Sequence, residues 1–360
     1  MLADSIFTTP LMESLFSDTA ELRLMLAFES ALATAQASMG VIPASVAETI
    51  KNCCAETDWD IESIKTQTLL AGNPAIPFVD QLRQRVRQKS PEAAQYVHQG
   101  ATSQDVIDTA LMSQLRQAID QLKADLEELI NQLTKLRQTY QHTPMMGRTL
   151  LQQALPITFG DKLAGWLSGL FRSTERLDRV RQECLVIQLG GPVGNGQSFG
   201  AHYRTICELM AAELDLGTTA TAWHTQRDRL ADLASTLGIL NGSLGKLAND
   251  IILLMQTEVG EVREGAAEGK GGSSSMPHKR NPVTSTFMVA IAHRTPYLVA
   301  SLLGAMNQPH ERAAGAWHSE WPVIRELVKL TAANLHHAND LIRTLDVDTA
   351  RMQQNLTTQP

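Results

Sequence analysis

Residues 230–254 read LADLASTLGILNGSLGKLANDIILL, and leucine or isoleucine recurs in them at alternating steps of three and four. This spacing places the apolar side chains on one stripe of an α-helix, the heptad-like pattern of helices that pack side by side. A helix of this length is rare in small globular domains and typical of helical bundles. Two interpretations of the stripe stay open: it forms the core of the chain's own bundle, or it faces another subunit.

Two more stretches share this pattern. Apolar residues advance by threes and fours through residues 105–136, and again through residues 159–184. Further helices are expected after Pro282 and after Pro322, which gives about five in the middle of the chain. Few stretches alternate apolar with polar residues, so the sequence predicts an all-α protein.

The first hundred residues differ from the rest because their predicted helices are shorter. Residues 21–39 form one such helix, closed by Gly40, and prolines separate it from its neighbours. We therefore expect an N-terminal helical domain over residues 1–104. A central long-helix bundle would follow over residues 105–345, interrupted by a loop at 265–282.

The composition excludes several classes of protein. The 360 residues include 31 basic and 38 acidic side chains, so the formal net charge is −7, and no run of Lys or Arg offers nucleic acid a clustered basic face. No apolar run approaches the roughly 20 residues of a membrane-spanning helix, and no signal-peptide pattern opens the chain. Only four cysteines occur, two of them adjacent, which favours a cytoplasmic location. No metal-ligand spacing is present, so no metal site is expected.

One loop between predicted helices carries the densest polar signal. Residues 269–282 read GKGGSSSMPHKRNP. Its glycines and serines offer backbone N–H donors, and the cluster His278, Lys279 and Arg280 adds positive charge, so the loop suits an anion. Composition alone would favour a solvated linker. The glycine spacing misses the phosphate-binding motifs, and no strand is predicted before it.

Three segments resemble the fumarase/aspartase superfamily. The first is HQGATSQD at residues 98–105, which resembles its first substrate-binding segment. GRT at residues 147–149, followed by QQALP at residues 152–156, resembles its second segment. SSSMPHKRNP at residues 273–282 resembles its signature loop, a very specific pattern. The segments occur in the superfamily's order, which argues strongly against coincidence.

Within the superfamily, the sequence resembles the family of bacterial 3-carboxy-cis,cis-muconate cycloisomerases. The stretches that carry this likeness lie at residues 223–229, 253–258, 268–273, 310–312 and 317–321. Adenylosuccinate lyase shares part of it, including a T-Q-x-x-x-R-D run and a loop that ends P-H-K-R-N-P. The resemblance therefore implies a cycloisomerase, with an amine-eliminating lyase as the alternative.

Three positions favour the cycloisomerase. Many superfamily lyases carry a histidine in the second segment and a glutamate after the loop lysine, where this chain has Leu150 or Gln153, and Thr286. None of these side chains titrates near neutral pH. A lyase that expels an amine or a hydroxide needs a group to protonate it. Lactone formation has no such need, because the attacking oxygen belongs to the substrate's own ionised carboxylate.

The resemblance also implies the roles of individual residues. Ser273 and Lys279 would be catalytic: the serine delivers a proton to carbon, and the lysine stabilises the extra negative charge on a substrate carboxylate. The implied substrate-binding residues are His98, Thr102, Ser103, Gln104, Gln226, Asn281 and Arg312. His98 could equally serve to hold its turn. No cofactor and no metal is implied.

The resemblance further implies a homotetramer, with active sites formed where subunits meet and a small anionic tricarboxylate as substrate. It also implies a smaller helical domain at the C-terminus, of which residues 346–360 would be the truncated start. Three functions remain in play: a cycloisomerase of the protocatechuate route of aromatic-acid breakdown, an adenylosuccinate-type lyase, and a catalytically silent paralogue. The complete set of Ser273, Lys279 and Asn281 disfavours the third.

Overall fold

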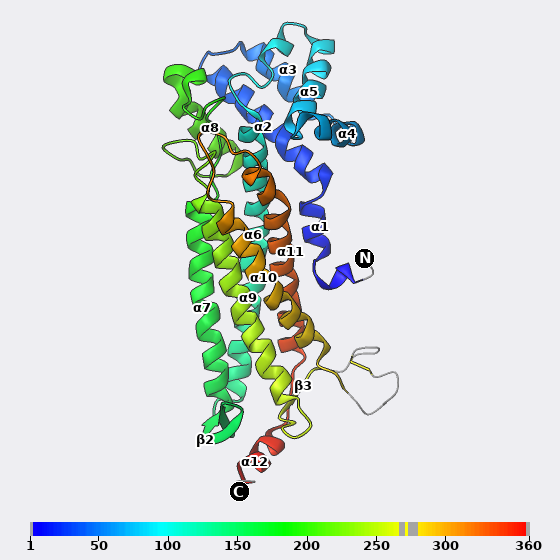
Figure 1. Cartoon of the computed structure of the whole chain (residues 1–360), viewed down its shortest axis with the longest axis vertical. Coiled ribbons are helices and arrows are strands. Elements are labelled where there is room, and N and C mark those ends of the chain that lie inside the picture. The colour runs from blue at the N-terminus through cyan, green and yellow to red at the C-terminus, as the bar shows by residue number, and fades with distance from the viewer. Residues whose placement is uncertain (1–2, 266–270, 273–279, 358–360) are drawn as a thin grey trace.

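The computed structural model describes residues 3–265, 271–272 and 280–357. It confirms the all-α class, with two small antiparallel sheets (Figure 1). The helices are α1 (Pro10–Leu15), α2 (Asp18–Ser38), α3 (Ala44–Cys54), α4 (Ile61–Ala71), α5 (Ala75–Lys89), α6 (Ser103–Thr139), α7 (Phe159–Glu183), α8 (Tyr203–Leu214), α9 (Asp228–Leu254), α10 (Val283–Gly304), α11 (Ala316–Arg343) and α12 (Thr349–Thr357). The strands are β1 (Pro144–Thr149), β2 (Gln152–Thr158), β3 (Val262–Arg263) and β4 (Asp346–Val347).

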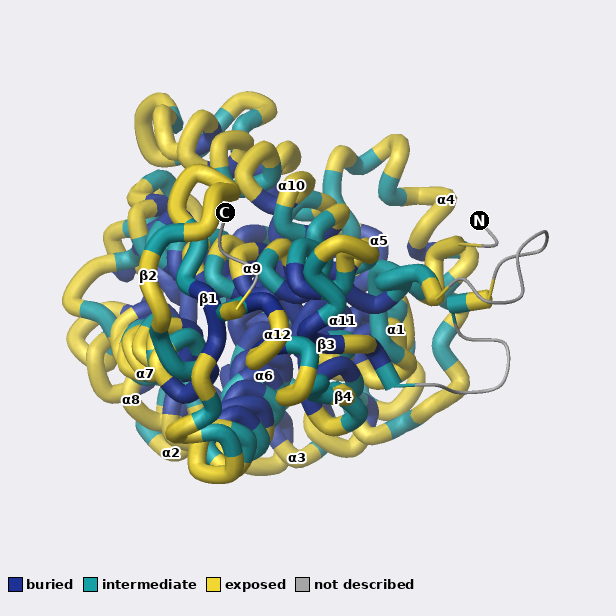
Figure 2. The backbone as a smooth tube through the Cα atoms, turned by 90° about the horizontal axis from the view of Figure 1, so that it is seen from below, coloured by how far each residue is buried: buried dark blue, intermediate teal, exposed yellow. Residues whose placement is uncertain are grey.

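Five long helices, α6, α7, α9, α10 and α11, run along the molecule and form the predicted bundle (Figure 1). The eight leucines and isoleucines of the stripe at residues 230–254 are buried within this one chain. The view along the bundle shows their place, with buried backbone in the middle and exposed backbone around it (Figure 2). The stripe therefore forms the chain's own core and does not face another subunit.

The prediction that the last long helix starts after Pro322 is wrong. Helix α11 begins at Ala316 and carries Pro322 in its interior. A proline usually ends a helix because it lacks an N–H donor and its ring crowds the carbonyl one turn earlier. Here the turn before Pro322 is held by tertiary contacts, since Trp317 and Glu320 are both buried. These contacts outweigh the local cost.

A second core lies at the N-terminal end of the bundle. It joins α2, α3 and α5 with the first turns of α6, and it includes Ile187 and Phe199 from the middle of the chain and Trp317 from α11. Segments remote in sequence therefore meet where α6 begins. The domain limits drawn from the sequence remain predictions.

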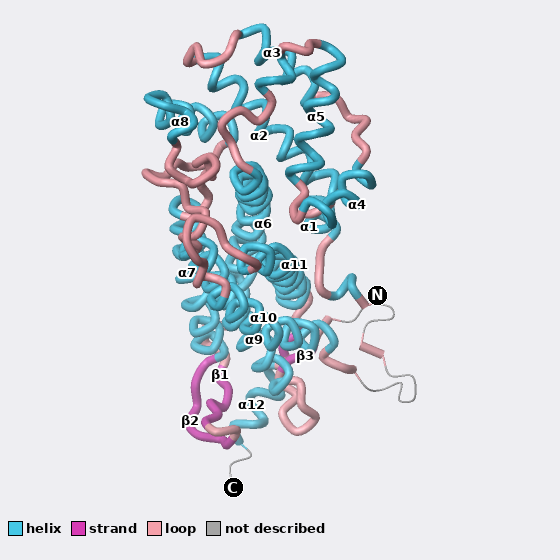
Figure 3. Tube along the Cα trace, turned by 45° about the horizontal axis from the view of Figure 1, so that its top comes forward, coloured by secondary structure: helices cyan, strands magenta, loops and turns pink. Residues whose placement is uncertain are grey.

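The hairpin of β1 and β2 was not expected from the sequence. It lies at the opposite end of the bundle from the N-terminal helices (Figure 3). Its two-residue turn is Leu150–Leu151, and both residues have positive φ, 50° and 64°. Asn and Gly usually occupy such turns, because larger side chains are strained there. The side chains of these leucines are 96% and 73% exposed.

Helices α9 and α10 are each long and apolar enough, by length and composition alone, to cross a membrane. Half of the apolar window of α9 is buried inside the bundle, so that helix has an ordinary core explanation. Only 22% of the window of α10 is buried. Its exposed apolar side chains include Tyr297 and Leu303, and Ile239 of α9 is also exposed. The bundle therefore carries an uncovered apolar surface on α10.

Candidate active site

The first matched segment forms the entrance to α6. His98 and Gly100 adopt left-handed backbone conformations, with φ of 62° and 80°, and turn the chain into the helix. Thr102 is the N-cap residue, and its backbone N–H donates to the Asp105 carboxylate over 3.0 Å. Ser103 is the first helical residue and is half-buried. The positive end of the helix dipole therefore lies beside two hydroxyl groups, an arrangement that suits an anion.

Asp105 joins this segment to two distant loops. Its buried carboxylate accepts hydrogen bonds from the backbone N–H groups of Gly190 and Gly191, at 3.0 and 2.9 Å. It also lies 2.7 Å from Nε2 of His224, which is buried as well. A single carboxylate thus fixes the start of α6, the loop that contains Gly190 and Gly191, and the segment before α9. Its role is to hold the site in shape, since its oxygens are already occupied.

Gln104 and Arg312 form a second connection. The Arg312 guanidinium donates to Oε1 of Gln104 and to the carbonyl oxygen of Gly191, both over 2.9 Å. The amide nitrogen of Gln104 donates to Asp108 and to the carbonyl oxygen of His224. Burial lowers the pKa of Arg312, and the negative charges of Asp105 and Asp108 oppose this lowering. Gln104 is 2% exposed, so its side chain has almost no contact with solvent. Its hydrogen bond holds Arg312 against α6.

Gln226 is exposed beside this group. The preceding residue, Thr225, donates a hydrogen bond from its hydroxyl to the carbonyl oxygen of His310 over 2.9 Å. The structure therefore brings six of the predicted residues to one end of the bundle: His98, Thr102, Ser103, Gln104, Gln226 and Arg312.

A buried ion cluster supports the same end and was not predicted. The Arg227 guanidinium donates to the carboxylate of Asp108 over 2.7 Å and to that of Glu320 over 2.6 Å. All three side chains are at most 2% exposed. Trp317 also donates to Asp108, over 3.0 Å. The cluster connects α6, the start of α9 and α11 next to the matched segment at residues 98–105.

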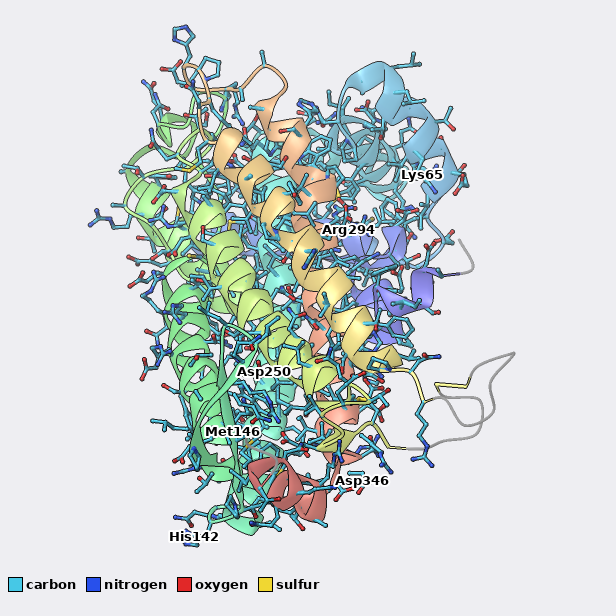
Figure 4. All side chains as sticks on the ribbon, turned by 60° about the horizontal axis from the view of Figure 1, so that its bottom comes forward. Lys65, His142, Met146, Asp250, Arg294 and Asp346 are labelled. Atoms are coloured by element: carbon cyan, nitrogen blue, oxygen red, sulfur yellow. The ribbon has the colours of Figure 1, made fainter. Side chains whose placement is uncertain are left out.

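The second segment and the ends of the signature loop lie at the other end. In Figure 4, Met146 marks β1 of the hairpin and His142 marks the turn just before it. Arg148 makes a two-pronged ion pair with the buried carboxylate of Glu261, at 2.8 and 3.0 Å. Glu264 accepts hydrogen bonds from the backbone N–H groups of Thr284 and Ser285 and so fixes the start of α10 beside β3.

Of the predicted loop residues, Asn281 is half-buried, and its backbone N–H donates to the carbonyl oxygen of Gly271 over 3.0 Å. The predicted catalytic residues Ser273 and Lys279 lie outside the described residues. Within the described part of the chain, no group of three or more His, Cys, Asp or Glu side chains is arranged to hold a metal ion.

Helix α6 separates the matched segments. It has 37 residues. At about 1.5 Å per residue, such a helix is about 55 Å long. The first segment enters it and the second follows it, so one chain holds them at opposite ends of its bundle (Figure 1). A substrate the size of a tricarboxylic acid cannot touch both segments of the same chain.

Comparison with known proteins identifies a lyase family. A protein family described as lyase matches residues 6–296. A 3-carboxy-cis,cis-muconate cycloisomerase from Pseudomonas putida is 44% identical over 355 residues, which cover 99% of this chain and 84% of that protein. One from Acinetobacter baylyi is 45% identical over 98% of this chain and 78% of its own length. The crystal structure of the 3-carboxy-cis,cis-muconate lactonizing enzyme from Pseudomonas putida superposes with a TM-score of 0.94 at 43% identity, covering 99% of this chain and 79% of that chain.

Proposed function

The chain belongs to this lyase family, and from that membership we propose that it interconverts 3-carboxy-cis,cis-muconate and 4-carboxymuconolactone as an intramolecular lyase. The observation that carries the proposal is the 44–45% identity to cycloisomerases over nearly the whole chain. The site supports it, because the α6 N-terminus and Arg312 favour an anionic ligand.

The chemistry places two demands on the protein. In the lactonising direction, a carboxylate oxygen of the substrate bonds to a carbon of the conjugated double bond. The electron pair of that bond moves to the adjacent carbon and into its neighbouring carboxylate. Groups that stabilise this added charge contribute about 3 to 4 kcal/mol each in comparable sites. We assign this role to Lys279 and Asn281, with Thr102 and Ser103 as further donors. Ser273 then delivers a proton to the carbon.

An ultraviolet assay tests the function. We expect the protein to deplete 3-carboxy-cis,cis-muconate without added metal or nucleotide, and to leave adenylosuccinate and fumarate unchanged. The reason is that Leu150, Gln153 and Thr286 provide no acid for an amine or hydroxide leaving group. Rapid turnover of adenylosuccinate would move the assignment to the amine-eliminating lyase. Loss of activity with a chelator would disprove the metal-free mechanism.

We further propose a cytoplasmic homotetramer with shared active sites and no cofactor. Its support is the length of α6, which keeps the first and second segments of one chain apart. The uncovered apolar side chains of α10 and of the hairpin turn also favour association, because monomeric proteins rarely expose large apolar patches. Each site would then combine the first segment of one subunit with the hairpin or loop of others.

Co-expression of two inactive variants tests the shared site. One variant is Ser273→Ala, and the other carries Thr102→Val with Ser103→Ala. If these groups belong to different subunits in each site, random mixing leaves about a quarter of the sites intact and restores activity. Light scattering should show a tetramer for each preparation. A fully active monomer, or mixed tetramers without activity, would contradict the arrangement.

A further inference from the structure

Helix α2 lies outside every matched segment, but two of its buried polar side chains contact the first of them. Glu29 and Gln36 stand seven residues apart on this helix, so they project from one face, two turns apart. Both are buried, at 1% and 2% exposure, among the apolar residues of the N-terminal core. Buried polar side chains need partners, and both find theirs in one turn, the one that leads into α6.

Gln36 anchors the backbone of that turn. Its amide nitrogen donates to the carbonyl oxygen of Gln99 over 2.9 Å. Glu29 anchors the neighbouring side chain instead: its Oε1 lies 2.5 Å from Nδ1 of His98. A carboxylate at this distance can only accept, so Nδ1 carries the hydrogen. The tautomer and the orientation of the imidazole are thereby fixed.

The other ring nitrogen of His98 makes no hydrogen bond to a described residue, and 13% of the side chain is exposed. In the part of the chain that the structure describes, the charged groups that act on the ring are Glu29 from α2, Asp105 from α6 and Arg83 from α5. Burial lowers the pKa of His98, but the charge and hydrogen bond of Glu29, with the charge of Asp105, outweigh it and raise the pKa above its usual value. Protonated His98 presents an N–H donor at Nε2.

We propose, on the basis of the proposed function, that Glu29 is a positioning residue: it holds Nδ1–H of His98 and leaves the charged Nε2–H edge to a carboxylate of the substrate. The chain has no acid at Leu150, Gln153 or Thr286, yet it keeps this buried carboxylate–histidine pair beside the N-terminus of α6. The pair transfers no proton to carbon. It adds a charged hydrogen-bond donor to a site for a trianion.

Glu29→Gln tests the role. Glutamine has the same shape and can still accept from Nδ1–H, but it removes the charge that opposes burial of the imidazolium. The pKa of His98 should then fall, and the neutral imidazole turns a lone pair at Nε2 toward the substrate. We expect KM for 3-carboxy-cis,cis-muconate to rise about tenfold with little change in kcat. The fall of kcat/KM with rising pH should move to lower pH, because the pKa of His98 falls.

Two variants distinguish positioning from structural support. Glu29→Asp keeps the charge and should keep the wild-type pH profile. Gln36→Met removes the other anchor of the same turn and no charge, so it should lower stability without moving the pH profile. The same shift in Gln36→Met and Glu29→Gln, or an unshifted profile in Glu29→Gln, would overturn the proposal.

Calorimetry separates this proposal from the proposed function. Tricarballylate, a saturated tricarboxylate, is titrated into wild-type protein and Glu29→Gln across a pH series. Affinity should fall as pH rises, with the fall at lower pH in the variant. This result without turnover of 3-carboxy-cis,cis-muconate would support the pair and reject the function. Turnover of 3-carboxy-cis,cis-muconate, with the same pH dependence of tricarballylate binding in both proteins, would support the function and reject the role of the pair. If the wild type showed neither turnover nor binding, both proposals would be rejected.

Discussion

Ser273→Ala is expected to lower kcat by roughly 10²- to 10⁴-fold, the usual contribution of a positioned proton donor. Binding should change little, because in the proposed mechanism the serine acts on the carbon that receives the proton, and this interaction arises in the transition state. The measurement is kcat and KM for 3-carboxy-cis,cis-muconate in protein whose oligomeric state has been determined by light scattering. Equal losses in kcat and kcat/KM would identify an interaction made only in the transition state.

The neighbouring serines provide matched controls. Ser274→Ala and Ser275→Ala remove the same hydroxyl one and two positions further along, and both should keep most activity. Lys279→Ala should damage both kcat and KM, since a cation attracts the anionic substrate before reaction as well as during it. An inactive Ser274→Ala variant beside an active Ser273→Ala variant would show that the proton donor has been assigned to the wrong serine.

Arg227→Met is expected to destabilise the fold by about 3 to 5 kcal/mol, the range for removing one partner of a buried ion pair. The methionine fills similar space but leaves the carboxylates of Asp108 and Glu320 buried without their cation. The stacking of Arg227 on Trp223, at 4.7 Å, is lost as well. Urea unfolding followed by circular dichroism measures the change at constant protein concentration.

The pH dependence of this loss identifies its cause. Burial raises the pKa of Glu320, and the Arg227 charge opposes that rise in the native protein. Without the arginine, a folded-state pKa further above the unfolded value means that the native state of the variant binds more protons. Its stability should then recover as pH falls.

Arg179→Met is the matched control for Arg227→Met. Arg179 also makes a two-pronged pair, with Asp232, but both side chains are well exposed. Its loss should leave the free energy of unfolding nearly unchanged. Equal effects of the two substitutions would show that burial of the Arg227 cluster contributes nothing to its importance.

The sequence predicts the bundle because helix periodicity is local. The stripe at residues 230–254 and the helices α6 and α7 follow from steps of three and four residues alone. Features that depend on remote partners were missed. The Leu150–Leu151 turn lacks the usual turn residues, and α11 passes through Pro322 because buried contacts hold its first turn.

The matched segments named residues that the structure brings to one end of the bundle, but the residues that support them could be identified only from the fold. Arg227 stands 119 positions from Asp108 and 93 from Glu320, and no periodic pattern joins residues so far apart. Glu29 left one readable signal: it interrupts the apolar face of the helix predicted at residues 21–39. A charge on such a face has to have a buried partner, although the sequence does not say which.

If the chain forms the proposed homotetramer, its hairpin turn has a consequence for subunits that have not yet associated. A newly synthesised chain carries Leu150, Leu151 and Leu155 in water at one end of its bundle, all at least 73% exposed. Chaperones and proteases bind exposed apolar segments of this kind. A chain that finds no partner would therefore be recognised and removed, whereas one that buries this tip escapes. Exposure of these three leucines would thus distinguish unassociated chains from associated ones in the cell.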